Sequence, residues 1–457
     1  MAIKGKTSDL MKALADEFIT YGGEIVDGWV TRIVADTKSC KGIQYQSGTA
    51  IGKWLTPRVI VATGGYAGLF AHGIQTPAYG TALGRFLVSG GGGVNLEFVF
   101  KHGYGRPDVG QLTPTEGLPG VEIYDEEKFH ATWLEKELYY GRGTANHLQA
   151  FRFWRRNHRK QYFIDFSYRV LWENVAELRK SLSMENGLKA QTQRRARETI
   201  IGMSREGKGE IVNQLISDWM DAPDGITFER FEELKQYIVP TAGAEISRIR
   251  QISYFSMGGL YHHNFETNLH NVFVTGEAMH DFGSHRVGGL PWALYLVSGK
   301  HIAGRIISEI RNGQRPRLRD FDLAPVLSAF APEALGEIRE KLYLYQEDNF
   351  EPDNAMECIR WFRKRRRELV TGGRYLDDAT AWYLVAEAIL VASLNRQESR
   401  GCFFRSDYPS TDGAYNDRNS YAQYDPDSDE IRARLITRDE LFGVNPVRKE
   451  AFNSAMR

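Results

Sequence analysis

The sequence has 457 residues, 42% of them hydrophobic and 12% aromatic, with 58 basic and 58 acidic side chains. A chain of this kind can bury large cores and is expected to form about three domains. The balanced charge gives no overall attraction to nucleic acid or to an anionic membrane surface, and the three cysteines form no C-x-x-C motif that would indicate a zinc site or a disulfide framework.

The sequence also bears on the compartment in which the protein works. The first residues lack the apolar core of a secretory signal. The longest apolar stretch, 381–394, contains Glu387 and is too short to span a bilayer. Three widely spaced cysteines suit a reducing compartment. We therefore expect a cytoplasmic protein without direct membrane insertion.

The N-terminal part predicts a helix followed by short strands. Residues 8–21 (SDLMKALADEFITY) place apolar side chains at helical spacing behind a residue of the N-cap type. The runs 23–36 (GEIVDGWVTRIVAD) and 41–48 (KGIQYQSG) alternate in polarity between glycine and aspartate turns, which predicts strands. A short buried strand over 59–62 (VIVA) then leads into Thr63-Gly64-Gly65.

The character of the sequence changes twice further along the chain. From about residue 96 to 250 it consists of polar and aromatic helical segments rich in arginine and tryptophan, which predicts an inserted domain. Buried-strand and glycine patterns return over 251–312, and the remainder is mostly helical with a polar C-terminal stretch. These changes predict four segments: 1–95, 96–250, 251–312 and 313–457.

Eight short motifs occur in a characteristic order: VIVATGGYAG, LEFVFKH, TEG, YFIDF, SMGGLYHHN, NVFVTGEA, HRVGG and RQESRGCFFRSDYP. In this order the chain resembles the flavoprotein subunits of succinate dehydrogenase and fumarate reductase, and L-aspartate oxidase. The resemblance covers essentially the whole chain. It implies an α+β fold in which the second half of a Rossmann-like FAD-binding domain is interrupted by a capping domain and followed by a helical C-terminal domain.

One element of the family pattern is absent from the sequence. In the family, an A-T-G-G turn closes a domain that opens with G-x-G-x-x-G, and no G-x-G-x-x-G can be drawn here, even in the glycine-dense run 89–97. Those glycines let the backbone approach the pyrophosphate of FAD. A second polypeptide carrying this lobe, a truncated or processed chain, and a chain that no longer binds FAD all remain open. We favour the second polypeptide.

The resemblance also implies a set of cofactor-binding residues. Glu277 follows a buried strand, where a carboxylate can accept hydrogen bonds from ribose or ribityl hydroxyls. Capping a helix is its structural alternative, and a tight turn is the structural alternative for the glycines after the first strand. The residues expected to contact FAD are Thr63, Gly64, Gly65, Gly276, Glu277, Gly288, Gly289 and Leu290.

A second implied set forms the substrate site. Arg286 matches an arginine that binds a substrate carboxylate, and the guanidinium fork suits a planar anion. Arg142 matches an arginine that exchanges a proton with the substrate carbon, a role that requires preorganisation because its pKa is high. A buried structural histidine is the alternative for His102. The residues expected at the substrate are Arg142, Arg286, His102, Thr115, Glu116 and Tyr254.

The sequence departs from the family pattern at several of these positions. Tyr254 and Phe403 stand where the family has histidines, and Pro291 and Trp292 replace small polar residues after the substrate arginine. A pocket with fewer hydrogen-bond donors binds a second carboxylate poorly, because a buried anion without donors is costly. We therefore expect succinate and fumarate to be poor substrates.

The expected function is flavin-dependent oxidoreduction of a small carboxylate by hydride transfer, within a complex that includes an iron–sulfur electron-transfer subunit. Two alternatives remain: an adenylylsulfate-reductase-like subunit, suggested by KHGYGRPDVG and CFFRSDYP, and a flavin-free structural subunit of a redox complex. Two basic runs, 152–160 and 360–367, are interpreted as solvated helix faces or as docking surfaces for an acidic partner. No metal site is expected.

Overall fold

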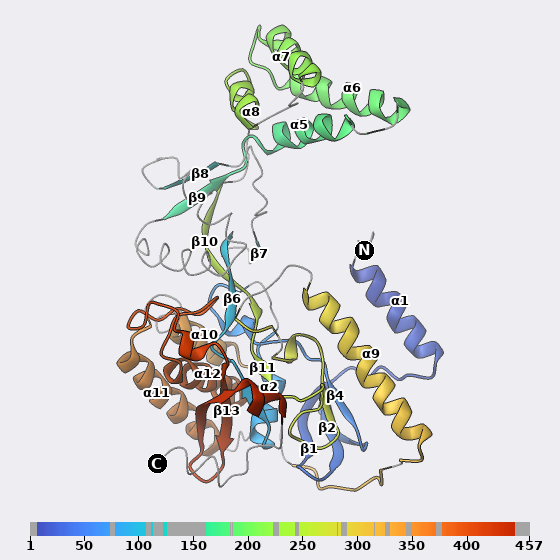
Figure 1. Cartoon of the computed structure of the whole chain (residues 1–457), viewed down its shortest axis with the longest axis vertical. Helices are drawn as coiled ribbons and strands as arrows, with labels where there is room; N and C mark the ends of the chain where they lie inside the picture. Colours follow the sequence, from blue (N-terminus) through green and yellow to red (C-terminus); the bar gives the residue numbers. More distant parts are fainter. Residues whose placement is uncertain are drawn as a thin grey trace.

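The computed structural model describes residues 7–73, 78–106, 111–112, 122–125, 161–182, 184, 186–222, 228–242, 246–280, 282–284, 290–314, 316–324, 330–343, 350–371 and 377–443. Figure 1 shows a body that contains both ends of the chain, from which strands lead to a separate group of helices. The mixture of helices and sheets confirms the predicted α+β class.

The N-terminal segment forms the predicted helix and strands. Helix α1 (Thr7–Thr20) precedes an antiparallel sheet in the order β1-β2-β3. Its strands are β1 (Trp29–Ala35), β2 (Cys40–Ser47) and β3 (Ala50–Leu55). Burial alternates along β2, as expected for a strand with one face on the core.

Two strands far apart in the sequence form a parallel pair. Strand β4 (Val59–Val61) pairs with β12 (Val272–Val274), so residues 251–312 return to the body. Helix α9 (Leu290–Arg311) follows β12 and covers it. The short elements around the pair are η1 (Ala67–Leu69), α2 (Thr81–Val88) and η3 (Gly276–Ala278).

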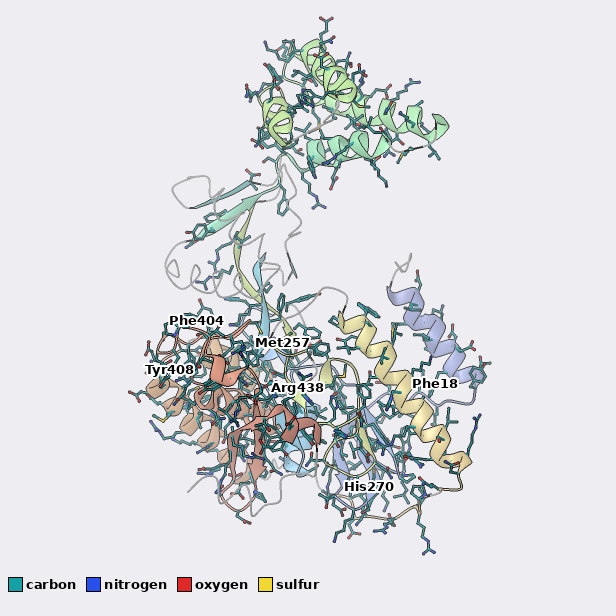
Figure 2. All side chains as sticks on the ribbon, viewed as in Figure 1. Phe18, Met257, His270, Phe404, Tyr408 and Arg438 are labelled. Atoms are coloured by element: carbon teal, nitrogen blue, oxygen red, sulfur yellow. The ribbon has the colours of Figure 1, made fainter. Side chains whose placement is uncertain are left out.

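The inserted segment combines a sheet with a group of helices. Its sheet has the order β7-β6-β10-β9-β8. The strands are β6 (Val99–Arg106), β7 (Gln111–Leu112), β8 (Glu122–Asp125), β9 (Tyr162–Asp165) and β10 (Ile246–Ser256). Strand β10 runs back into the body, where Met257 is labelled at the junction in Figure 2.

The helices of the inserted segment have their own hydrophobic core. They are α5 (Arg169–Ser181), α6 (Asn186–Gly202), α7 (Gly209–Asp221) and α8 (Phe228–Lys235). Leu171, Ile216 and Phe231 are buried among them in a cluster distinct from the body. This group, the helical module, is therefore stabilised by its own packing.

The C-terminal segment contains predicted helices and a strand pair that the sequence did not predict. The elements are α10 (Pro332–Leu342), α11 (Pro352–Thr371), α12 (Asp378–Asn395), η5 (Gly413–Tyr415), β13 (Arg418–Asp425), β14 (Glu430–Thr437) and α13 (Arg438–Gly443). The hairpin β13–β14 joins β5 (Gly92–Val94) and β11 (Gly259–Leu260) in the order β11-β5-β13-β14. One hydrophobic core, containing Val274, Trp382 and Phe403, therefore unites distant parts of the chain.

The basic run 360–367 lies on α11 and is paired within the protein. Arg363 Nε lies 2.8 Å from Oε1 of Glu387, a carboxylate fully buried on α12, and Arg365 pairs with Glu337 at 3.1 Å. Burial raises the pKa of Glu387, and the neighbouring guanidinium of Arg366 opposes this shift. Much of this run is therefore an internal ion-pair network. The run 152–160 lies outside the described residues.

Ion pairs also fix α9 to the N-terminal segment. Glu309 accepts hydrogen bonds from Arg58 and Arg305, each at 3.0 Å, and Arg305 also pairs with Glu266. Burial alone would raise the pKa of Glu309, but the bonds from Arg305 and Arg58 lower it overall.

A carboxylate with a lowered pKa stabilises the folded state above its unfolded pKa, about 4.3, and that contribution is lost as the pH falls through the folded pKa. Between pH 7 and pH 3 we expect the wild type to lose more thermal stability than Glu309→Gln. Melting curves followed by circular dichroism test this, and parallel pH profiles for the two proteins would contradict it.

Among the described residues, no helix is both long and apolar enough to cross a bilayer.

Candidate functional site

The carboxyl ends of β4 and β12 lie side by side. Val61 pairs with Val274, and the Thr275 amide donates to the Val61 carbonyl at 2.9 Å. The turn 63–65 leaves the first strand and the turn 275–277 leaves the second. The structure thus brings together Thr63, Gly64, Gly65, Gly276 and Glu277, all predicted to contact FAD. Ligands of parallel sheets commonly bind at this end of the strands.

Two glycines form an open cradle at these strand ends. Gly64 has φ 75° and Gly276 has φ 74°, a region that other residues enter at a cost. Among the described residues, no atom would lie within 4 Å of a Cβ atom added to either glycine. The Cβ positions of both glycines are therefore open among the described residues, and a ligand could approach the backbone there.

The neighbouring Gly65 has the opposite environment. A Cβ atom there would lie 2.5 Å from Oε1 of Glu277 and 2.7 Å from Cβ of Ser256. The hydroxyl of Ser256 accepts a hydrogen bond from the Tyr66 amide at 2.7 Å. Only glycine fits at this position, because the turn packs directly on Ser256.

Ser256 also anchors Glu277. Oε1 of this buried carboxylate accepts a hydrogen bond from the Ser256 amide at 2.8 Å. One carboxylate oxygen thus holds the end of β10 against the turn after β12, a role that the sequence interpretation missed. The signal was present in the S-M-G-G motif, of which Ser256 is the first residue.

The two glycines of the S-M-G-G motif allow close packing of the backbone beneath the site. A Cβ atom on Gly258 would lie 2.6 Å from the Val94 carbonyl oxygen, and one on Gly259 would lie 2.7 Å from the Met279 carbonyl oxygen. The Met257 amide donates to the Phe98 carbonyl at 2.9 Å. The motif thus brings β10, β11 and the turn after β12 together.

Of the residues predicted to contact the substrate, Tyr254 lies at a bulge in β10. Ser253 pairs with Lys101 and Phe255 pairs with Phe100, so Tyr254 is an extra residue between them. Its half-buried ring packs edge-on against Phe100, with 6.0 Å between ring centroids. Bulges redirect side chains and are frequent beside active sites. His102 lies on the paired strand β6, opposite Ile252, and the structure describes only its backbone.

The structure describes only the backbone of Leu290 and none of the other remaining predicted residues. Leu290 begins α9, with its backbone alone described. Six residues lie outside the described ranges: Thr115, Glu116, Arg142, Arg286, Gly288 and Gly289. The structure therefore assembles one half of the predicted site, the strand ends, and their roles remain predictions.

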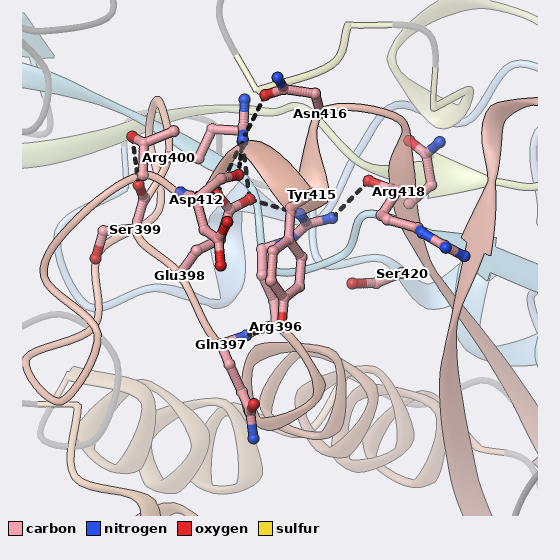
Figure 3. Close-up of polar contacts among 12 residues, drawn as sticks. Arg396, Gln397, Glu398, Ser399, Arg400, Asp412, Tyr415, Asn416, Arg418 and Ser420 are labelled. Atoms are coloured by element: carbon pink, nitrogen blue, oxygen red, sulfur yellow. Dashed lines mark hydrogen bonds and ion pairs between the residues drawn. The ribbon is translucent and has the colours of Figure 1, made fainter.

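The C-terminal E-S-R motif forms a buried ion cluster, drawn in part in Figure 3. Arg396 is fully buried and lies 2.6 Å from Glu97 and 3.0 Å from Glu398. Arg400 reaches the same Glu398 at 2.8 Å, and the Ser420 hydroxyl donates to Glu97 at 2.7 Å. The cluster ties the loop after α12 to β13 and to the residues after β5.

This cluster positions the loop that carries Phe403. The Phe403 ring is buried and lies edge-on to Phe98 and Phe350, with centroids 6.0 and 6.3 Å away. The Cys402 amide donates to the Ser284 carbonyl at 3.1 Å, two residues before Arg286. Phe403 is thus a packing residue of the core beside the segment that carries the predicted substrate arginine.

Burial also fixes the ionisation of two neighbours of the site. Burial, reinforced by the nearby Glu97 carboxylate, raises the pKa of Tyr66 well above its ordinary value. Its hydroxyl donates to the Leu96 carbonyl at 2.8 Å. Burial likewise raises the pKa of Cys402, so this thiol stays protonated at neutral pH. In the part of the chain that the structure describes, no group of three or more His, Cys, Asp or Glu residues is placed to hold a metal ion.

Known proteins are similar to this chain in fold. Residues 378–451 match the family model described as "Fumarate reductase flavoprotein C-term". A quinol fumarate reductase chain of E. coli superposes with a TM-score of 0.57 at 15% identity, covering 92% of this chain and 71% of that one. The Sdh1 complex of Mycobacterium smegmatis gives 0.59 at 18%, covering 93% and 70%. The chain has the flavoprotein-subunit fold.

Another enzyme has a similar fold. Adenylylsulfate reductase from Archaeoglobus fulgidus superposes with a TM-score of 0.53 at 13% identity, covering 92% of this chain and 73% of that one. A search of curated protein sequences finds no match. The comparisons confirm the predicted resemblance to fumarate reductase and succinate dehydrogenase flavoprotein subunits, and at these identities they establish the fold.

Proposed function

We propose that this chain is the flavoprotein part of an oxidoreductase that acts on a small carboxylate. The observation that carries the proposal is the cradle formed by Gly64 and Gly276 at the ends of two parallel strands. It fits FAD, because a dinucleotide requires close approach to backbone amides at this end of a sheet. FAD bound there supplies hydride transfer at its N5 atom.

In this proposal the protein binds, orients and protonates the substrate. Arg286 binds a substrate carboxylate through two parallel hydrogen bonds. Arg142 exchanges a proton with the substrate carbon, while Thr115 and Glu116 orient the substrate. His102 and Tyr254 extend the site along β6 and β10, whose pairing the structure shows. An iron–sulfur subunit is the proposed electron partner.

The flavin assignment predicts a specific loss in Gly64→Ala. Alanine at φ 75° costs about 1–2 kcal/mol of stability, and its methyl group would enter the open cradle. We expect the variant to fold but to lose most of its bound FAD. Flavin absorbance per protein measures this.

Gly313→Ala is the matched control. Gly313 has φ 77°, and a Cβ atom added there also has no atom of the described chain within 4 Å, but this glycine follows α9 far from the strand ends. It should show a similar loss of stability with unchanged flavin content. Equal flavin content in the two variants would show that FAD does not bind at the cradle.

The substrate assignment predicts weaker binding in Arg286→Lys. Lysine keeps the charge but lacks the planar fork, and losing a charged hydrogen bond costs ~1.5–3 kcal/mol, or roughly ten- to more than a hundredfold in affinity. Apparent affinity for the carboxylate substrate and flavin content are measured on the same preparation. Unchanged kinetics would exclude Arg286 from the site, and joint loss of flavin and activity would indicate a structural role.

A second candidate function is adenylylsulfate reduction. The fold match to that reductase and the aromatic Tyr254 at the bulge, in place of the histidine of the dicarboxylate enzymes, favour it. Parallel turnover assays of the flavin-loaded complex with adenylylsulfate, succinate and fumarate separate the two candidates. Preparations of the assembled complex that never contain flavin would instead support a structural subunit.

A further inference from the structure

A tight turn over residues 263–266 flanks β12 on the edge opposite β4. Glu266 pairs with Phe273 in antiparallel orientation, and the Val274 amide donates to the Phe265 carbonyl at 2.9 Å. Val274 is the last residue of β12, directly before the turn that forms one side of the cradle. The turn 263–266 therefore holds the end of β12 in place.

The backbone of this turn is unusual. Its two central residues, Asn264 and Phe265, have φ angles of 49° and 65°. His263 and Glu266 exchange hydrogen bonds across the turn, at 2.8 and 3.1 Å. Two-residue turns with positive φ angles favour asparagine and glycine, and a bulky side chain is strained in this region. Phe265 therefore keeps its conformation only because surrounding contacts impose it.

The buried ring of His262 supplies one of these contacts. The Phe265 amide donates to Nδ1 of His262 at 3.2 Å, and the two rings stack with their centroids 5.4 Å apart. A neutral imidazole carries one N–H group, so Nδ1 accepts a hydrogen bond only when the proton is on Nε2. A protonated imidazole donates from both nitrogens and accepts at neither. The closed turn therefore requires a neutral His262.

A second buried histidine lies against His262. The ring centroid of His280 is 4.4 Å away, and each of the two side chains is 3% exposed. Nδ1 of His280 donates to the Leu260 carbonyl at 3.0 Å, so His280 can also be protonated on Nε2 without losing this bond. A charge on His280 would further oppose a charge on His262, because like charges repel. The other titratable or charged groups around the pair are Tyr261 beside His280, His263 and Glu266 in the turn, and His301 and Arg305 on α9.

We propose that His262 is a pH-sensitive clamp, which holds the turn 263–266 closed while its ring is neutral and releases the end of β12 when the ring is protonated. Opening the turn breaks the bond from the Phe265 amide and admits water to the ring. An imidazole in water takes up a proton with a pKa of about 6.5. In the closed turn His262 takes up none. Because opening binds one proton, the closed turn is stable above this pKa and is lost progressively below it.

Hydrogen exchange of the full-length protein, followed by mass spectrometry at pH 8 and pH 5, tests the clamp. Exchange of the peptide spanning 264–275 is expressed as protection relative to the intrinsic amide rate, because that rate also changes with pH. One proton taken up with a pKa of about 6.5 lowers the protection by about thirtyfold over this range. His262→Asn should lose this response, because the asparagine Oδ1 accepts from the Phe265 amide and does not titrate.

Flavin content provides a second readout, which rests on the proposed function. If FAD binds at the strand ends, release of β12 beside Gly276 should lower the flavin content of wild type at pH 5 and leave that of His262→Asn unchanged. Exchange that depends on pH without loss of FAD would support the clamp and contradict the flavin site.

His263→Asn is the matched control for both readouts. It removes a neighbouring imidazole that is exposed in the same turn, and it should respond to pH as wild type does. Melting curves followed by circular dichroism show whether each variant is folded. Protection that is independent of pH in wild type, that falls equally in His262→Asn, or that loses its pH dependence in His263→Asn would overturn the proposal.

Discussion

Replacing Arg396 by methionine is expected to lower the free energy of unfolding by about 3–5 kcal/mol. The guanidinium is fully buried between Glu97 and Glu398, at 2.6 and 3.0 Å. Without it, the buried Glu97 carboxylate loses the guanidinium 2.6 Å away, whereas Glu398 keeps Arg400 at 2.8 Å, and burying an uncompensated charge is costly. Urea unfolding followed by tryptophan fluorescence measures the loss.

Arg194→Met provides the comparison. Arg194 pairs with Glu198 at 2.8 Å, a distance close to those in the buried cluster, but its side chain is 81% exposed on α6. Exposed pairs of this kind contribute little, so we expect no measurable change in unfolding. Similar losses in the two variants would show that Arg396 does not act through a buried ion cluster.

Gly65→Ala is expected to remove bound flavin and to destabilise the protein by about 1–3 kcal/mol, the usual cost of overpacking. The added methyl group would lie 2.5 Å from Glu277 Oε1, so the turn after β4 must separate from the carboxylate that anchors β10. The combined loss distinguishes this variant from Gly64→Ala, whose methyl group enters open space. Flavin content and urea unfolding are measured together.

Gly336→Ala is a control in which the free energy of unfolding should change in the opposite direction. Gly336 lies inside α10, and a Cβ atom there meets no atom of the residues that the structure describes within 4 Å. Alanine favours the helix over glycine by about 0.5–1 kcal/mol, so this variant should be more stable with unchanged flavin. A Gly65→Ala protein that unfolds like wild type would mean that the turn does not pack tightly on Ser256 and Glu277.

Local patterns predicted the elements around the strand ends well. The runs at 59–62 and 272–274 are short and apolar, and each leads into a Thr-Gly turn, so both strands and the turns that follow them could be predicted from sequence. The prediction that 59–62 is buried was wrong in part, because Ile60 is 50% exposed. Their pairing required the family resemblance, because more than two hundred residues separate them. Gly65 was predicted at the site, and its close contact with Ser256 explains why glycine is required there.

Long-range partners account for what the sequence did not predict. Strand β14 alternates polar and apolar residues over 430–435, a strand signal that the sequence interpretation missed, and its sheet is completed by β5, more than three hundred residues earlier. Arg396 appears in the sequence as one charge among many, and its burial depends on Glu97 from a distant segment. In the sequence, the run 360–367 resembles a basic surface. In the folded protein, α12 and β14 provide the carboxylates that pair with it, Glu387 and Glu430.

The most direct test of the account is the flavin content of the native complex. The complex is purified from its source cells without added cofactor, denatured, and assayed for released FAD and for each polypeptide. The account predicts FAD in proportion to this chain. A complete complex without FAD, or FAD that stays bound when Gly64 is replaced by alanine, would contradict the assignment of the strand ends as a flavin site.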